Sequence, residues 1–144
     1  MSNVPNGVFR ILTSPFDGEQ LCLTNSGGDD LTLLPPGGEG QSFEAQATSD
    51  GYAIHLASHV FPARYLSYQG APDAPRDGAI LRLQVSEFPP CNWHVAIAPG
   101  FTFRLAANGS DLAMGIAPIQ IHPPRLHLSR ESALGWVFEL VKVE

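Results

Sequence analysis

A set of short apolar segments recurs three times, in the same order, along this chain of 144 residues. Each copy begins with an apolar–basic–apolar triplet, continues with a Leu-x-Leu triplet and ends with a large aromatic residue. Corresponding segments lie 43 to 50 residues apart, and chance does not preserve such an order through three copies. The repeated segments are residues 9–11, 54–56 and 103–105, residues 31–33, 81–83 and 126–128, and Phe43, Trp93 and Trp136.

The pattern within each copy is typical of β-strands. Helical periodicity is almost absent, and the apolar segments are short and alternate with polar residues. Clusters of Gly, Pro, Asn and Asp separate them, in a chain that contains 14 glycines and 13 prolines. A further apolar segment lies between the two triplets of each copy, at residues 21–23, 65–67 and 112–114. Four strands in each of three copies predict twelve strands.

Two all-β architectures are built from repeated units of about this length. A propeller blade also has four strands, but three blades are too few to close a propeller, for which four is the usual minimum. Twelve strands in three pseudo-equivalent units fit a β-trefoil, a short barrel capped by three hairpins. We therefore predict one β-trefoil domain over residues 1–144, with units at roughly 7–50, 51–99 and 100–144. Each unit buries its apolar face only against the other two, so the aromatic residues and paired leucines are the expected core.

The charge of the chain limits its partners. The formal net charge is −6, whereas nucleic acids and anionic membrane surfaces attract clustered lysines and arginines. We therefore expect no nucleic-acid partner and no membrane partner. The first residues, MSNVPNGVF, lack the basic and apolar regions of a signal peptide, and no apolar run approaches the roughly 20 residues that span a bilayer. The sequence accordingly predicts a cytoplasmic protein.

Common catalytic and metal-binding motifs are missing from the sequence. No HExxH, CxxC, P-loop or GxSxG pattern occurs, and nothing singles out a pair of carboxylates. The five histidines lie in different repeats without ligand spacing, so we expect no metal and no cofactor. Cys22 and Cys91 both lie near apolar residues, and we interpret them as small core residues. The sequence thus predicts a protein that is not an enzyme and has no catalytic residue.

Function is then expected in the loops, which a rigid scaffold presents at the surface. Between the second and third strands, the first copy has the stretch TNSGGDD at residues 24–30, which is the shortest of the three loops and lacks proline. The corresponding loops, residues 69–79 and 117–124, contain proline, which stiffens a loop. We expect residues 24–30 to form the slimmest and most flexible projection at that level. This pattern is consistent both with a plain hairpin turn and with a loop that binds a partner.

One loop of the second unit contains a large apolar residue with little polar cover. Phe61 lies beside Pro62 in the loop of residues 58–63. An exposed aromatic residue next to proline suits an anchor that fills a pocket of a partner. The alternative is that Phe61 plugs one end of the barrel.

The chain resembles the fungal β-trefoil protease inhibitors, which include the mycocypins, the cospin-like serine protease inhibitors and the cocaprins. The resemblance rests on a small, acidic trefoil with few cysteines, no signal peptide and an aromatic-rich last strand in GWVFELVKVE. Its size and loop layout look most like the cocaprins, which inhibit papain-like cysteine proteases and pepsin-like aspartic proteases. The resemblance implies that target proteases are the partners and that inhibition is reversible and occlusive. A homodimer would fit the resemblance, although nothing in the sequence determines the oligomeric state.

The resemblance also implies which loops would enter a protease. In mycocypin-like inhibitors surface loops, some of them bearing glycine, wedge into the protease cleft. The best match to such a cysteine-protease wedge is the segment Asn25, Ser26, Gly27, Gly28, Asp29 and Asp30. For aspartic proteases, the candidate second inhibitory loops contain Phe61, Pro62, Asp73, Pro75, Arg76 and Asp77.

A carbohydrate-binding lectin is the alternative function. The β-trefoil lectins of the ricin-B type carry a Q-x-W motif near the end of each unit. Only residues 41–43 (QSF) approximate the motif here, because the other units read CNW at residues 91–93 and LGW at residues 134–136. Glycans are therefore partners only under this alternative.

Overall fold

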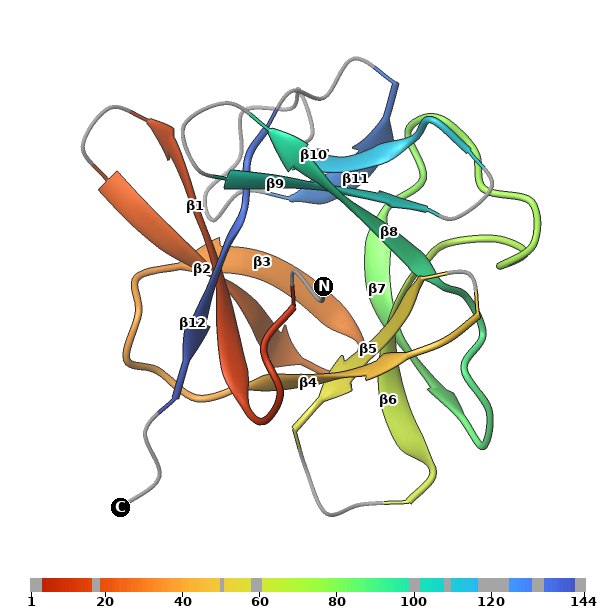
Figure 1. Ribbon diagram of the computed structural model, residues 1–144, viewed down its shortest axis with the longest axis horizontal. Helices are drawn as coiled ribbons and strands as arrows, with labels where there is room; N and C mark the ends of the chain where they lie inside the picture. Colours follow the sequence, from red (N-terminus) through yellow and green to blue (C-terminus); the bar gives the residue numbers. More distant parts are fainter. Residues whose placement is uncertain are drawn as a thin grey trace.

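The described part of the chain consists of twelve β-strands joined by turns and loops (Figure 1). The structure is a computed structural model that describes residues 4–16, 19–49, 51–57, 61–98, 102–107, 110–116, 125–130 and 134–141. These residues include no helix that is long and apolar enough to cross a membrane. The predicted loop of residues 117–124 lies outside the described residues.

The strands follow the threefold repeat of the sequence, four to each unit. The first unit contains β1 (Phe9–Phe16), β2 (Glu19–Gly27), β3 (Asp30–Leu34) and β4 (Phe43–Ala47). The second contains β5 (Tyr52–Leu56), β6 (Ala63–Tyr68), β7 (Leu81–Ser86) and β8 (Trp93–Ala98). The third contains β9 (Thr102–Ala107), β10 (Ala113–Ile116), β11 (Leu126–Ser129) and β12 (Val137–Leu140). The fold is the predicted β-trefoil.

The first and last strands of each unit form a closed barrel. Antiparallel pairing runs from β12 through β1, β4, β5 and β8 to β9. The ring closes where Phe103 and Trp136 exchange two backbone hydrogen bonds of 2.8 Å each. A second closed path of seven strands runs β1, β2, β3, β7, β6, β5 and β4. Closure leaves few unpaired strand edges around the barrel.

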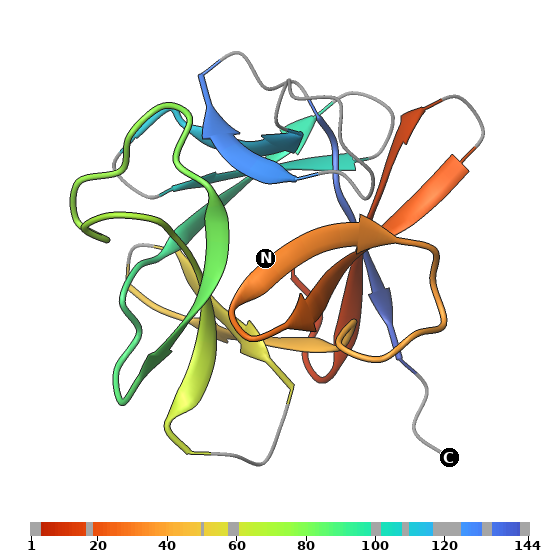
Figure 2. The same cartoon turned by 180° about the vertical axis from the view of Figure 1, so that it is seen from behind.

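The second and third strands of each unit form hairpins that meet at one end of the barrel. Figure 2 shows β3, β7 and β11 arranged around a common centre, as expected for a pseudo-threefold axis. The residue just before each Leu-x-Leu triplet pairs with the middle residue of the triplet in the next unit. Three such pairs close the ring of hairpins: Asp30 with Arg82, Ile80 with His127, and Arg125 with Thr32.

The predicted core is confirmed. Phe43, Trp93 and Trp136 are completely buried, and the indole nitrogens of the two tryptophans donate to the carbonyl oxygens of Leu66 and Met114 at 3.1 and 3.4 Å. The leucines of the Leu-x-Leu triplets are all at most 5% exposed. Period-2 alternation therefore places these leucines inside and the middle residue of each triplet on the other face of the strand.

Replacement of a triplet leucine should destabilise the whole domain. Leu83 is completely buried, so Leu83→Ala leaves a cavity and should lower the free energy of unfolding by about 2–5 kcal/mol. Leu140 is 56% exposed, and the same substitution there should cost less than about 0.5 kcal/mol. Urea unfolding followed by tryptophan fluorescence measures both, and equal losses would contradict the core assignment.

Candidate functional site

The predicted glycine loop is a tight hairpin rather than a long loop. Strand β2 continues to Gly27 and β3 begins at Asp30, so only Gly28 and Asp29 form the turn. The register shifts between Asn25 and Gly27, which leaves Ser26 as a bulge. Most of the stretch TNSGGDD is therefore paired backbone.

The tip of this hairpin is narrow and open to solvent. Gly27 and Gly28 have φ angles of 135° and 54°, in the region that favours glycine. No atom lies within 4 Å of the position that a Cβ would take on either residue. Ser26, both glycines and Asp30 are exposed. The turn thus has glycine at positive φ, as the simpler interpretation expects, and it also projects a backbone edge free of side chains.

Asp29 anchors the tip to the second unit. Its carboxylate accepts hydrogen bonds from Arg64 on β6 and Arg82 on β7, each at 3.1 Å. The Leu83 amide donates to the Asp29 carbonyl oxygen at 2.9 Å, and Arg64 also donates to the carbonyl oxygen of Gly28. The tip therefore lies against a neighbouring hairpin that is distant in the sequence, a contact that the sequence analysis did not predict.

The base of the hairpin is held from its other side by Asn25. The Asn25 side-chain amide donates to the carbonyl oxygens of Asp30 and Gly28 at 2.9 and 3.2 Å. The Asn25 backbone amide donates to Gly40 at 2.8 Å, and a side chain at Gly40 would collide with the Asn25 carbonyl oxygen. Asparagine at this position thus closes the turn by an ordinary side-chain-to-backbone bond.

These contacts determine geometry more than stability. The side chains of Asp29, Arg64 and Arg82 are 41%, 27% and 48% exposed, so solvent screens the two ion pairs. Pairs of this kind contribute roughly 0.2–1 kcal/mol each. Their main consequence is that several polar groups of residues 25–30 already have partners within the chain.

Phe61 lies on the surface, so it does not plug the barrel. Its side chain is 76% exposed, and Phe88, which the sequence analysis did not select, is 75% exposed. Phe61 precedes β6 and Phe88 follows β7, each two residues beyond the Ala63–Ser86 pair that ends the ladder. Both residues also precede proline in the sequence, and this shared Phe-Pro dipeptide is the signal that could have identified Phe88. The Phe61–Pro62 peptide bond is cis.

The remaining predicted residues belong to the long loop at the other end of this ladder. Asp73, Pro75, Arg76 and Asp77 lie between Gln69 and Ile80, whose backbones are joined by a 2.8 Å hydrogen bond. Tyr68 donates its hydroxyl to the carbonyl oxygen of Pro72, and Gly78 donates to Leu128 at 2.7 Å. The ladder between β6 and β7 is about 16 Å long. Phe61 and the Asp73–Asp77 segment therefore leave opposite ends of one ladder.

The side chains that could carry nucleophilic chemistry are unsuited to it. Burial raises the pKa of Cys22 and of Cys91 from 9.0 to about 11, so both thiols stay protonated near neutral pH. Cys91 donates instead to the Leu66 carbonyl oxygen at 3.4 Å. Within the ranges that the structure describes, no three His, Cys, Asp or Glu side chains gather in a way that could hold a metal ion.

Gln41, the one glutamine that matches the lectin motif, has a structural role. It is 2% exposed, and its side-chain oxygen accepts from the amides of Gly37 and Gly38 at 2.9 and 3.2 Å. Its nitrogen donates to Thr24 and Pro35 at 3.1 and 2.9 Å. Because both the oxygen and the nitrogen of its side-chain amide bond to other residues of this chain, Gln41 holds the loop between β3 and β4 in place.

Comparisons with known proteins support the fold. No protein-family model matches the sequence, and no curated protein matches it. Among solved structures, the ricin B-like lectin of Macrolepiota procera in complex with lactose is similar with a TM-score of 0.73 and 17% identity, over 96% of this chain and 99% of the lectin chain. The designed threefold symmetric protein ThreeFoil is similar with a TM-score of 0.69 and 16% identity, over 92% and 99% of the two chains. Identities this low demonstrate a shared β-trefoil fold alone.

Because burial keeps the cysteine thiols protonated in the folded chain, the free energy of unfolding should depend on pH in the alkaline range. The pKa of Cys22 is about 11 in the folded chain, against the ordinary 9.0, so the unfolded state loses its proton first as pH rises. The free energy of unfolding should therefore fall between pH 9 and about 11, by about 1 kcal/mol from this thiol at pH 10. Urea unfolding of the native chain and of Cys22→Ala at pH 8 and 10 tests this. An identical decrease in both proteins would contradict the assignment.

Proposed function

We propose that this protein is a reversible inhibitor of proteases and that it blocks the protease cleft with surface loops instead of reacting with it. The proposal assigns the hairpin tip of residues 25–30 to papain-like cysteine proteases. It assigns the exposed Phe-Pro segments around Phe61 and Phe88 to pepsin-like aspartic proteases. Neither role requires a catalytic group.

The observation that carries the proposal is the combination of a narrow tip with a fixed base. A protease cleft admits a single extended or tightly turned backbone, and glycine lets that backbone approach without Cβ clashes. Gly27 and Gly28 have open space around them, while Asp29 is held by two arginines. Association costs less free energy when a loop is already ordered, because less conformational entropy is lost on binding.

The residues of the tip and the two cysteines also fit binding without cleavage or covalent bonding. Protease subsites bind the side chains of a substrate, and the tip has two glycines instead. The protease would therefore have few side-chain contacts with which to position this backbone for cleavage. Partial or complete burial keeps both cysteine thiols protonated near neutral pH, so neither supplies a thiolate that could bond covalently with a target. Binding by backbone hydrogen bonds and shape would be reversible.

The Phe-Pro segments suit a second binding surface. Anchors of protein interfaces are large side chains that are exposed in the free protein and fill pockets of the partner. Phe61 and Phe88 are each about three-quarters exposed and leave the same end of the ladder between β6 and β7. The tip belongs to the β2–β3 hairpin and contacts β6 and β7 through Arg64 and Arg82, so the two surfaces lie on adjacent hairpins.

A charged side chain at the tip should abolish inhibition of papain. We expect Gly28→Glu to raise the inhibition constant at least a hundredfold, because the side chain projects from the position that enters the cleft. Gly37→Glu is the matched control, since Gly37 also has positive φ, 113°, and no atom within 4 Å of its Cβ position. Residual papain activity titrated with each protein gives the constants, and thermal unfolding checks that both variants fold with a similar loss of roughly 1–2 kcal/mol. Unchanged inhibition by Gly28→Glu would place the wedge elsewhere.

Removal of the two exposed rings should weaken inhibition of pepsin and leave papain untouched. The double variant Phe61→Ser and Phe88→Ser should lose at least tenfold in pepsin inhibition, since each anchor contributes about 2 kcal/mol. Ile97→Ser, at a residue that is 80% exposed on β8, is the control. A glycan-binding screen accompanies these assays. Native protein that binds glycans and inhibits neither protease would replace this proposal with the lectin alternative.

A further inference from the structure

A polar hollow of about 320 Å³ lies where the three hairpins meet. It opens on the face of the molecule that carries the ring of interunit pairs, which Figure 2 shows from the front. Volumes of this size are typical of small-molecule sites. The hollow is lined by Asp29, Asp30, Gln69, Ile80, Leu81, Arg82 and Arg125.

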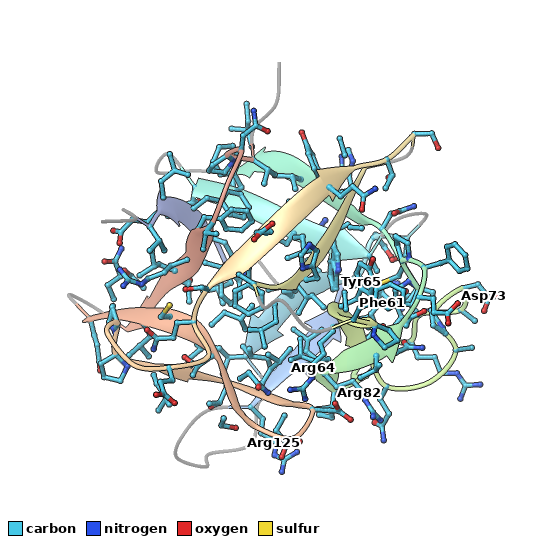
Figure 3. All side chains as sticks on the ribbon, turned by 90° about the horizontal axis from the view of Figure 1, so that it is seen from below. Phe61, Arg64, Tyr65, Asp73, Arg82 and Arg125 are labelled. Atoms are coloured by element: carbon cyan, nitrogen blue, oxygen red, sulfur yellow. The ribbon has the colours of Figure 1, made fainter. Side chains whose placement is uncertain are left out.

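The ring of interunit pairs brings two arginines to this hollow from different units. On β3, Asp30 pairs with Arg82 of β7, and Thr32 pairs with Arg125, just before β11. These two positions on β3 are two residues apart, or about 6.6 Å. Figure 3 shows Arg64, Arg82 and Arg125 on the same side of the molecule. The threefold closure of the fold therefore builds a cluster of guanidinium groups that are distant in the sequence.

The charged side chains around the hollow differ in how many of their hydrogen-bonding groups already have partners. Asp29 accepts from both Arg64 and Arg82, so its charge is already compensated. A guanidinium has five N–H donors, and the contact with Asp29 uses a single nitrogen of Arg82. Within the described ranges, the side chain of Arg125 has no hydrogen-bond or ion-pair partner and is exposed. Unused donors thus face a polar hollow in a chain whose net charge is −6.

We propose that this hollow binds the oxyanion group of a small ligand, a carboxylate, sulfate or phosphate. Arg125 and the unused donors of Arg82 hold the oxyanion, because a guanidinium matches carboxylate and phosphate oxygens in a planar, two-point contact. The Gln69 side chain supplies an additional amide donor at the rim. Asp29 and Asp30 belong both to this lining and to the proposed protease-binding tip, but anion binding is measured without a protease, so its test is independent of the proposed inhibition.

Asp30 determines how tightly an anion binds. Its carboxylate lines the same hollow and repels a second negative charge. It also accepts hydrogen bonds, so a ligand with hydroxyl groups beside its acid group gains a contact that bare sulfate lacks. We therefore expect sugar acids to bind more tightly than inorganic ions, and we expect added salt to weaken all of them.

Titration of the full chain with anions at low ionic strength tests the site. Backbone amide NMR follows sodium sulfate, sodium phosphate, glucuronate and, as a neutral comparison, glucose. Saturable shifts of Leu81, Arg82 and Arg125 with the three anions and not with glucose are the expected result. Tighter binding of glucuronate than of sulfate would assign the site to organic acids, and the reverse order would assign it to inorganic anions.

A pair of matched variants separates this site from general charge effects. Arg125 and Arg130 are exposed arginines on either side of β11, and Arg130 pairs instead with Asp111 at 3.2 Å. For sulfate, which has no hydroxyl group for Asp30 to bind, we expect Arg125→Gln to weaken binding at least tenfold, Arg130→Gln to change it less than twofold, and Asp30→Asn to strengthen it at least threefold. Thermal unfolding monitors folding of all three variants. Equal weakening by both arginine variants, weaker binding by Asp30→Asn, or no saturable shift in the native chain would each overturn the proposal.

Discussion

Each unit of this chain can bury its apolar face only against the other two, and everything else in the molecule depends on that closure. Within the barrel, Phe103 of β9 and Trp136, just before β12, close the ring by reciprocal hydrogen bonds. Where the hairpins meet, three interunit pairs lock them into a ring. The buried leucines of the Leu-x-Leu triplets fill the space between. Because the ring holds the hairpins at fixed positions, side chains from different units meet on the outer face of the cap.

Asp29 is the best example of a residue that contacts side chains of another unit. A glycine-rich turn in isolation would sample many conformations, since glycine loses more backbone entropy on ordering than other residues. Here the neighbouring unit supplies Arg64 and Arg82, which together hold the carboxylate, and Leu83 holds the carbonyl oxygen of the same residue. Weak, partly exposed contacts are sufficient, because the barrel has already brought the two hairpins together. Contact of the tip with the second unit is thus a property of the assembled trefoil.

The three units depart from threefold symmetry in the side chains of their interunit pairs. The middle residues of the three triplets are Thr32, Arg82 and His127, and the residues before them are Asp30, Ile80 and Arg125. The fold requires only that their backbones pair, so their side chains are free to differ. That freedom gives one sector of the cap two arginines and an acidic neighbour around a hollow. The same reasoning applies to the exposed Phe61 and Phe88, which lie beyond the last pair of a ladder.

The sequence by itself determined the class and plan of the fold. Buried strands show up as short alternations of apolar and polar residues, and the chain repeats these alternations at nearly constant spacing. It also indicated the buried aromatic residues and the hairpin turn at Gly28, while function in the surface loops stays a prediction. It did not reveal the contacts of Asp29 with the second unit, the shared position of Phe61 and Phe88 at one end of a ladder, or the convergence of Arg82 and Arg125. These features depend on which loops become neighbours when the barrel closes, and residues 43 apart in sequence, such as Arg82 and Arg125, carry no local signal of contact. Only the tertiary structure decided them, since side-chain proximity across units is set by packing of the whole ring.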